Sequence, residues 1–181
     1  MKVYLAFING HQPPAANDLA EDLRRRTPFT VDYLKADFSL KPFFSPERRQ
    51  YYSTAILAEL LKRRPADGEK ILGVTDVDLY VPILTFLFGE AQLNGPGALI
   101  STHRLHAEFY GLPRDPRLLY GRTLKEALHE LGHTIGLVHC PDYRCVMHSS
   151  TSVEDSDIKE AAYCAVCSET VAGYGGEWGF G

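Results

Sequence analysis

Cysteine is missing from the first part of this 181-residue chain. Residues 1–128 contain none, so no thiolate from this segment can block a metal site and hold it latent. Long basic runs are also missing, and the net charge is −4 with an isoelectric point near 6.0. This charge balance argues against a nucleic-acid partner.

No stretch approaches the roughly 20 apolar residues that a membrane-spanning helix needs. The opening segment MKVYLAFING has only a short apolar run, which predicts a first strand and not a secretory signal. We therefore expect a soluble, cytoplasmic protein without a membrane partner. With 45% hydrophobic residues the chain can form one compact domain; a monomer is compatible with this composition, and the oligomeric state stays open.

The most informative segment is HELGHTIGLVHC, residues 129–140. His129 and His133 are four residues apart, so a helix places both imidazoles on one face. Gly136 can adopt a positive φ at little cost, which lets the chain turn at the helix end and bring His139 back toward them. Three imidazoles match a catalytic zinc site whose fourth position is open. Glu130 is not a ligand in this arrangement and is the expected general base.

The surrounding residues predict the helix itself. Thr123 and Glu126 have the spacing of a capping box that would begin it. The apolar residues that follow recur at helical intervals, which leaves His129, Glu130 and His133 on the other side, facing a cleft. This apolar stripe consists of Leu124, Ala127, Leu128, Leu131 and Ile135.

All four cysteines follow the third histidine in the pattern C-x4-C and then C-x2-C, as Cys140, Cys145, Cys164 and Cys167. Two arrangements compete. Two disulfides would suit a secreted protein, whereas a four-cysteine zinc site suits a reducing cytosol and matches the spacing of structural zinc ligands. We favour zinc, which gives one catalytic and one structural ion per chain.

The two zinc sites would share a backbone segment, because Cys140 directly follows His139. We expect the cysteine-bound zinc to fix the loop that carries the third imidazole. It would also tie this loop to a helix that begins near Thr151, where Glu154 completes a second capping-box pattern. Cys164 and Cys167 would lie at the far end of that helix.

HELGHTIGLVH resembles the zinc signature of the metzincins, and Met147, eight residues beyond His139, resembles the methionine of their Met-turn. A cysteine directly after the third histidine, followed by Cys145-Val-Met147 and Cys164-x2-Cys167, is similar to the archaemetzincins in particular. The resemblance covers residues 129–167.

This resemblance implies a compact, metzincin-like zinc peptidase fold, in which a mixed, mostly parallel twisted sheet is flanked by helices and an HExxH helix carries the active site. It also implies a zinc metallopeptidase that hydrolyses peptide bonds. One departure is Ser149, which stands where some metzincins have a zinc-binding tyrosine. The implied roles are catalytic zinc ligands for His129, His133 and His139, general base for Glu130, structural zinc ligands for Cys140, Cys145, Cys164 and Cys167, and a hydrophobic floor for Met147.

The rest of the chain predicts a mixed α/β domain in which strands and helices alternate. Helices are expected at residues 17–26 and 46–64, and strands at residues 3–8, 29–34 and 70–75. Residues 85–92 and 98–102 predict a hairpin around Asn94-Gly95-Pro96-Gly97. In the metallopeptidases that the chain resembles, an edge strand above the zinc holds an extended substrate, and residues 86–92 are the best candidate. An ordinary hairpin strand is the alternative.

We expect a single metallopeptidase domain over residues 1–181. Residues 1–136 would form an N-terminal subdomain that ends with the active-site helix, and residues 137–172 a C-terminal subdomain with the four-cysteine site. Residues 173–181 predict a flexible Gly-rich tail. The alternative is that its aromatic side chains, Tyr174, Trp178 and Phe180, cover the cleft.

Three functions are compatible with these patterns. The leading one is a zinc-dependent peptidase that acts on a peptide substrate. The same residues would serve a zinc hydrolase of small amides or esters. The third is a non-catalytic, zinc-stabilised binding module, against which Glu130 argues because a structural metal site does not need that carboxylate. Endopeptidase and aminopeptidase-like action both stay open, as do the cleavage preference and the physiological substrate.

Overall fold

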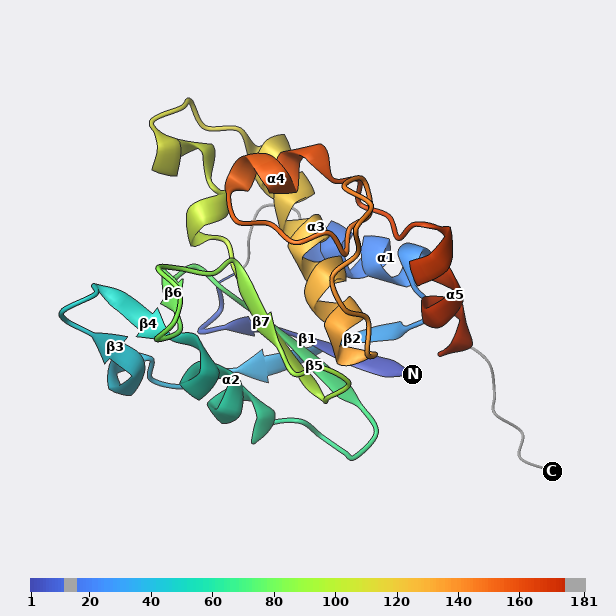
Figure 1. The fold of residues 1–181 in the computed structure, drawn as a ribbon. Helices are drawn as coiled ribbons and strands as arrows, with labels where there is room; N and C mark the ends of the chain where they lie inside the picture. The colour runs from blue at the N-terminus through green and yellow to red at the C-terminus, as the bar shows by residue number, and fades with distance from the viewer. Residues whose placement is uncertain (12–15, 175–181) are drawn as a thin grey trace.

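A five-stranded sheet of order β2-β1-β5-β8-β7 forms the centre of the computed structural model, which describes residues 1–11 and 16–174 (Figure 1). The first four strands in this order run parallel, and β7 pairs antiparallel with β8. The predicted mixed, mostly parallel sheet is therefore confirmed. Its strands are β1 (Lys2–Ile8), β2 (Thr30–Ala36), β5 (Lys70–Thr75), β7 (Gly89–Ala91) and β8 (Gly97–Ser101).

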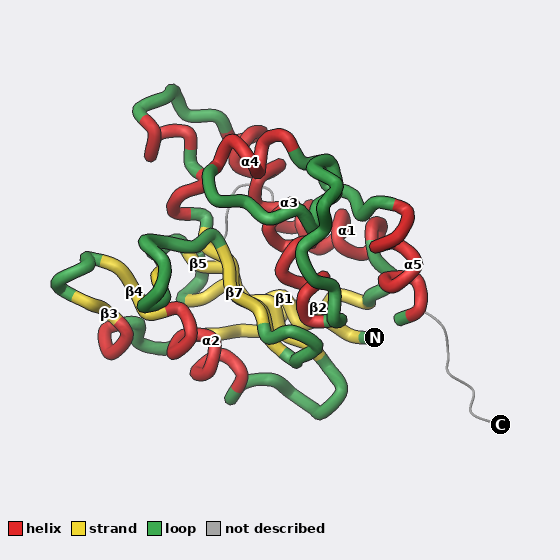
Figure 2. Tube along the Cα trace, in the orientation of Figure 1, coloured by secondary structure: helices red, strands yellow, loops and turns green. Residues whose placement is uncertain are grey.

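Helices cover both faces of this sheet (Figures 1 and 2). The inner strand β1 shows why, since its side chains alternate between two apolar clusters. Val3, Leu5 and Phe7 pack with α1 (Ala16–Arg26) and α3 (Pro116–Thr134). Ala6 and Ile8 pack with α2 (Ser53–Leu61) on the opposite face.

The helix predicted over residues 46–64 is wrong in its first half. A small second sheet of β3 (Phe44–Ser45), β4 (Gln50–Tyr52) and β6 (Leu79–Tyr80) occupies this region, and α2 begins only at Ser53. The turn between β3 and β4 places Arg49 at a φ of 55°. Aromatic pairs across the strands, Phe44 with Tyr51 and Tyr52 with Tyr80, favour the sheet over a helix.

Helix α3 begins earlier than predicted. Asp115 is its N-cap and accepts hydrogen bonds from the amides of Arg117 and Leu118, while Pro116 occupies the first turn. Thr123 lies inside the helix, where its hydroxyl donates to the carbonyl of Leu119. The predicted apolar stripe is confirmed, since all five of its residues are buried in the apolar cluster that also contains Val3, Leu5 and Phe7 of β1.

The segments after α3 also differ from the prediction. Helix α4 (Val153–Ile158) is capped by Ser152 and Asp155 and not by Thr151 and Glu154. It ends well before Cys164, which instead precedes α5 (Ala165–Gly173). Among the residues that the structure describes, three short 3₁₀ helices complete the fold, at Lys41–Phe43, His103–Leu105 and Ala107–Tyr110.

The predicted hairpin of β7 and β8 is present, but residues 85–88 before it do not form a regular strand. No helix within residues 1–11 and 16–174 combines the length and apolarity needed to cross a membrane.

Gly73 of β5 tests how tightly the sheet packs on α2. A Cβ there would lie 2.5 Å from Leu60 Cδ2 and 3.1 Å from Leu99 Cδ1. We expect Gly73→Ala to lower the free energy of unfolding by about 1–3 kcal/mol through overpacking. Gly121→Ala, on an open face of α3, should instead raise it by up to about 1 kcal/mol. Urea unfolding of both variants measures this, and equal stabilities would contradict the described packing.

Candidate functional site

The site is organised by the way α3 ends. Gly136 adopts a φ of 88°, its amide donates to the carbonyl of His133 at 3.0 Å, and the Leu137 amide donates to the carbonyl of Gly132 at 3.0 Å. These two bonds form a Schellman motif, which reverses the chain after the helix. The Lys70 ammonium donates to the carbonyl of Thr134 at 2.6 Å and so stabilises the same terminus. The predicted glycine turn is confirmed.

The turn brings His139 to the two histidines of α3. The Nε2 atoms of His129 and His133 are 3.1 Å apart, and one ring nitrogen from each of the three histidines lies within 4.8 Å of the others. Two rings are oriented by backbone carbonyls: His129 Nδ1 donates to Val146 at 2.8 Å and His133 Nδ1 donates to Leu137 at 2.7 Å. Each bond leaves Nε2 free to face the common point.

This cluster fits a zinc ion. Tetrahedral ligands at about 2.0–2.1 Å from zinc lie roughly 3.3–3.4 Å apart, close to the observed nitrogen separation. Burial lowers the pKa of His129 to about 3, and it also lowers the pKa values of His133 and His139. All three imidazoles are therefore neutral near pH 7, which is the form that binds a metal.

Met147 directly follows Val146, whose carbonyl orients His129, and it is completely buried. Its sulfur packs against Gly132, where any side chain would overlap it. Its carbonyl accepts a hydrogen bond from the amide of Cys140 at 2.9 Å. Gly132 is the residue that makes room for the Met147 side chain, and the Met-turn role that the resemblance implies stays a prediction.

The four cysteines form a second cluster next to the first. Their sulfur atoms lie within 4.8 Å of one another, and Cys140 Sγ is 3.8 Å from Cys164 Sγ. Thiolates at about 2.3 Å from a tetrahedral zinc are roughly 3.8 Å apart, so the cluster fits a closed structural site. The thiols are free and not joined in disulfides. Cys145 Sγ also accepts a hydrogen bond from the amide of Cys164 at 3.3 Å.

Hydrogen bonds connect the two clusters. His148 Nδ1 donates to the carbonyl of Cys140 at 2.8 Å, and Lys159 Nζ donates to the carbonyl of His148 at 3.0 Å. Cys140 itself follows His139 in the chain. The loop that carries the third imidazole is thus held from the cysteine side, although α4 does not contribute in the predicted way.

Glu130 faces a cleft of about 510 Å³ that contains all three histidines. The carboxyl group is buried; this burial, and then the neighbouring Glu126 carboxylate, raises the pKa of Glu130 well above its ordinary value. Gly89 of β7 lies directly against it, since a Cβ at this position would be 2.7 Å from both Cγ and Oε1 of Glu130. The backbone of β7 thereby limits the positions that the Glu130 carboxylate can adopt.

Several residues of the cleft were missed by the sequence analysis. Lys159 is only 1% exposed at its side chain, and its Nζ lies 3.9 Å from Glu126 Oε1. Both residues line the cleft, together with Ser149, Ser150 and Thr151. Glu126 was not missed, because it shares the histidine face of α3, which the sequence predicts to look into the cleft. No local pattern indicated Lys159 as a cleft residue. The helix predicted from Thr151 extended past this residue, whereas α4 ends at Ile158.

Tyr174 does not lie in the cleft. Its hydroxyl donates to Asn94 Oδ1 at 3.4 Å, and it is not among the residues that line the cavity. The other aromatic residues of the Gly-rich tail, Trp178 and Phe180, lie outside the described residues, so the expectation for residues 175–181 stays a prediction.

Sequence similarity connects this chain to a known peptidase family. The model of peptidase family M54 matches residues 33–172. The archaemetzincin of Methanocaldococcus jannaschii is 51% identical over 120 residues, which are 66% of this chain and 65% of that protein, slightly less than two thirds of its length. The archaemetzincin of Archaeoglobus fulgidus is 38% identical over 174 residues, which are 94% of this chain and 99% of that protein.

The fold agrees with a solved structure as well. The crystal structure of archaemetzincin from Methanopyrus kandleri superposes with a TM-score of 0.82 at 35% sequence identity. The superposition covers 95% of this chain and 93% of that one. The similarity therefore extends over nearly the whole chain and is not limited to the histidine motif.

Cys164→Ser tests whether the cysteine cluster holds the loop of His139. We expect zinc bound per chain to fall, and hydrogen exchange of the amides at residues 137–148 to rise by at least about tenfold, because the loop loses its anchor. Metal analysis and exchange mass spectrometry measure both effects. Ser168→Ala, on the exposed side of α5, is the matched control. Unchanged zinc content and unchanged amide protection in Cys164→Ser would show that the cysteine cluster does not hold the loop of His139.

Proposed function

The chain belongs to peptidase family M54, and from this premise we propose that it is a zinc-dependent peptidase with a second, structural zinc. The observation that carries the proposal is the placement of Glu130. Its carboxylate is buried in the cleft next to three converging imidazoles, and it is not needed as a ligand. A site that only bound metal would have no use for this group.

His129, His133 and His139 are the proposed catalytic ligands, and Cys140, Cys145, Cys164 and Cys167 the proposed structural ones. Zinc bound to the histidines would supply Lewis-acid chemistry, which polarises a carbonyl group and lowers the pKa of water. Glu130 takes a proton from the attacking water and returns it to the leaving amine. Met147 forms the floor under the ligands.

We propose that the substrate lies along β7. This strand is at the end of the sheet order, so its second edge has no partner strand among the described residues. An extended peptide can add to such an edge through backbone hydrogen bonds, which places its carbonyls in front of Glu130. The edge favours a peptide over a small amide or ester, for which an enclosed pocket would be enough.

The finer features of the proposal are the compartment, the subdomains and the mode of cleavage. Four free cysteines that bind zinc suit the reducing cytoplasm. The division after residue 136 coincides with the Gly136 turn, which supports an N-terminal part up to α3 and a C-terminal part with the cysteine cluster. The positions at which peptides are cut will distinguish endopeptidase from aminopeptidase-like action.

Glu130→Gln tests the general base. The amide keeps the volume of the side chain but cannot accept the proton, so we expect kcat on a fluorogenic peptide library to fall about 10²- to 10⁴-fold. Zinc content should stay at the wild-type value, which metal analysis of the same sample measures. Glu169→Gln, at an exposed position, is the matched control. An active Glu130→Gln protein with full zinc would refute the assignment.

Gly89→Ala tests the contact between β7 and the base. The added methyl group has no room beside Glu130, so the carboxylate must shift. Because a displacement of about 1 Å in an active site can cost on the order of 10²-fold in rate, we expect a loss of kcat of this size. Zinc content should stay at the wild-type value, which metal analysis of the same sample measures. Wild-type turnover by Gly89→Ala would show that β7 does not position Glu130.

A further inference from the structure

The residues that line the cleft fall into two groups. One group is the continuous segment of residues 84–91, here called the apolar wall, which includes Leu84, Phe86 and Phe88. The other group is polar and consists of the histidines, Glu126, Glu130, Ser149, Ser150, Thr151 and Lys159. The large apolar residues that line the cleft therefore all come from one segment of the chain.

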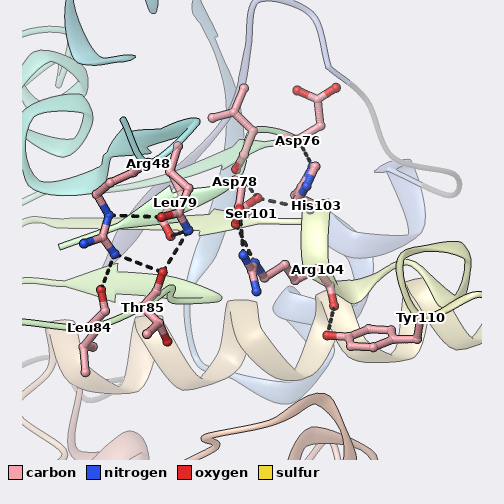
Figure 3. Close-up of polar contacts among 12 residues, drawn as sticks. Arg48, Asp76, Asp78, Leu79, Leu84, Thr85, Ser101, His103, Arg104 and Tyr110 are labelled. Carbon is pink, nitrogen blue, oxygen red and sulfur yellow. Dashed lines mark hydrogen bonds and ion pairs between the residues drawn. The ribbon is translucent and has the colours of Figure 1, made fainter. Parts of the chain in front are cut away.

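The apolar wall is held in place although part of it has no regular secondary structure. Arg48 Nη2 donates to the carbonyl of Leu84 at 2.7 Å and to that of Thr85 at 3.1 Å (Figure 3). Gln50 Nε2 donates to the same Thr85 carbonyl at 2.9 Å, and its Oε1 accepts from Arg48 Nε at 3.1 Å. Side chains of the β3–β4 turn and of β4 thus fix the backbone of residues 84–85.

A second guanidinium fixes Phe86. Arg104 makes a two-pronged ion pair with Asp78, with separations of 2.6 and 2.8 Å (Figure 3). It lies over the Phe86 ring at 4.3 Å, and the edge of Phe86 meets Phe88 with ring centroids 5.2 Å apart. Ion pairing and stacking together leave this ring little freedom.

Leu84 is the exposed end of this wall. Leu84 lines the cleft and is 50% exposed, while its carbonyl is held by Arg48. An apolar side chain that is fixed but not covered gains free energy when a ligand removes it from water. Because the wall is already ordered, little conformational entropy is lost on binding.

We propose that Leu84 and Phe86 form a preformed apolar subsite that selects peptides with a large apolar side chain at one position, and that Arg48 is its positioning residue. This inference rests on the proposed peptidase function, because it assigns a preference to the same cleft. The wall continues directly into β7 at Gly89, so a peptide paired with that strand carries its side chains past it.

Peptide binding tests the subsite without requiring turnover. The probes are fluorescein-labelled octapeptides of Gly and Ser in which one Ser is replaced by Leu at each position in turn. They are titrated into zinc-loaded Glu130→Gln protein, which should not cleave them. We expect Leu at one position to bind about tenfold more tightly than Ser, the lower end of what apolar pockets discriminate.

Leu84→Ser in this background should reduce that preference to less than about threefold. Ile83→Ser is the matched control, because Ile83 is 90% exposed and does not line the cleft; its preference should remain. Arg48→Lys should weaken the preference as well, since an ammonium cannot reproduce the planar contacts to both carbonyls. Arg63→Lys is the control for Arg48→Lys and should leave the preference unchanged. The Arg63 guanidinium lies 4.5 Å from the centre of the Phe38 ring, and Arg63 does not line the cleft.

The outcomes separate the subsite from the peptidase activity. A Leu preference that Leu84→Ser removes, in a wild-type protein that hydrolyses no peptide, supports the subsite and refutes the peptidase. Hydrolysis without a Leu preference, or with a preference that Leu84→Ser leaves unchanged, supports the peptidase and overturns the subsite. If the peptides neither bind nor are cut, both are refuted.

Discussion

The reversal of the chain at Gly136 is the constraint on which both the histidine cluster and the cysteine cluster depend. A helix can present only two of the three histidines, because residues further along its axis move away by 1.5 Å per residue. The left-handed glycine ends α3 and returns His139 to the face of His129 and His133. The same reversal places Cys140 at the start of the cysteine cluster, so one backbone conformation determines where both clusters begin.

The loop beyond this turn supports the histidines through its backbone carbonyls. Those of Val146 and Leu137 orient two imidazoles, and that of Met147 binds the amide of Cys140. The loop thus acts as an outer shell for the histidines, while its own position is tied to four thiols. Outer-shell hydrogen bonds set the orientation and basicity of ligands. In the proposed two-zinc arrangement, a closed cysteine site would support an open histidine site by making this outer shell rigid.

The ligand residues could be predicted because metal binding imposes a spacing that helical periodicity explains: His129 and His133 share a face, and Gly136 permits the turn. Hydrophobic periodicity, which is also a local pattern, predicted the alternation of strands and helices and the apolar stripe of α3. The failures have two causes. Tyr52, Ile56 and Leu60 recur at helical intervals, which hid the strand that precedes α2. Arg48, Gly89 and Lys159 act through contacts distant in sequence, for which no local pattern exists.

Strand β7 joins the position of the base to the position of the substrate. Its backbone touches Glu130 at Gly89, and its free edge offers the proposed pairing surface. A peptide aligned on that edge is therefore aligned with the carboxylate by the same few residues, without adjustment of a flexible loop. Arg48 and Arg104 extend this order to Leu84 and Phe86. The backbone register and the apolar wall then belong to one continuous segment, and this segment touches the base on α3, so a shift of the segment also displaces the carboxylate.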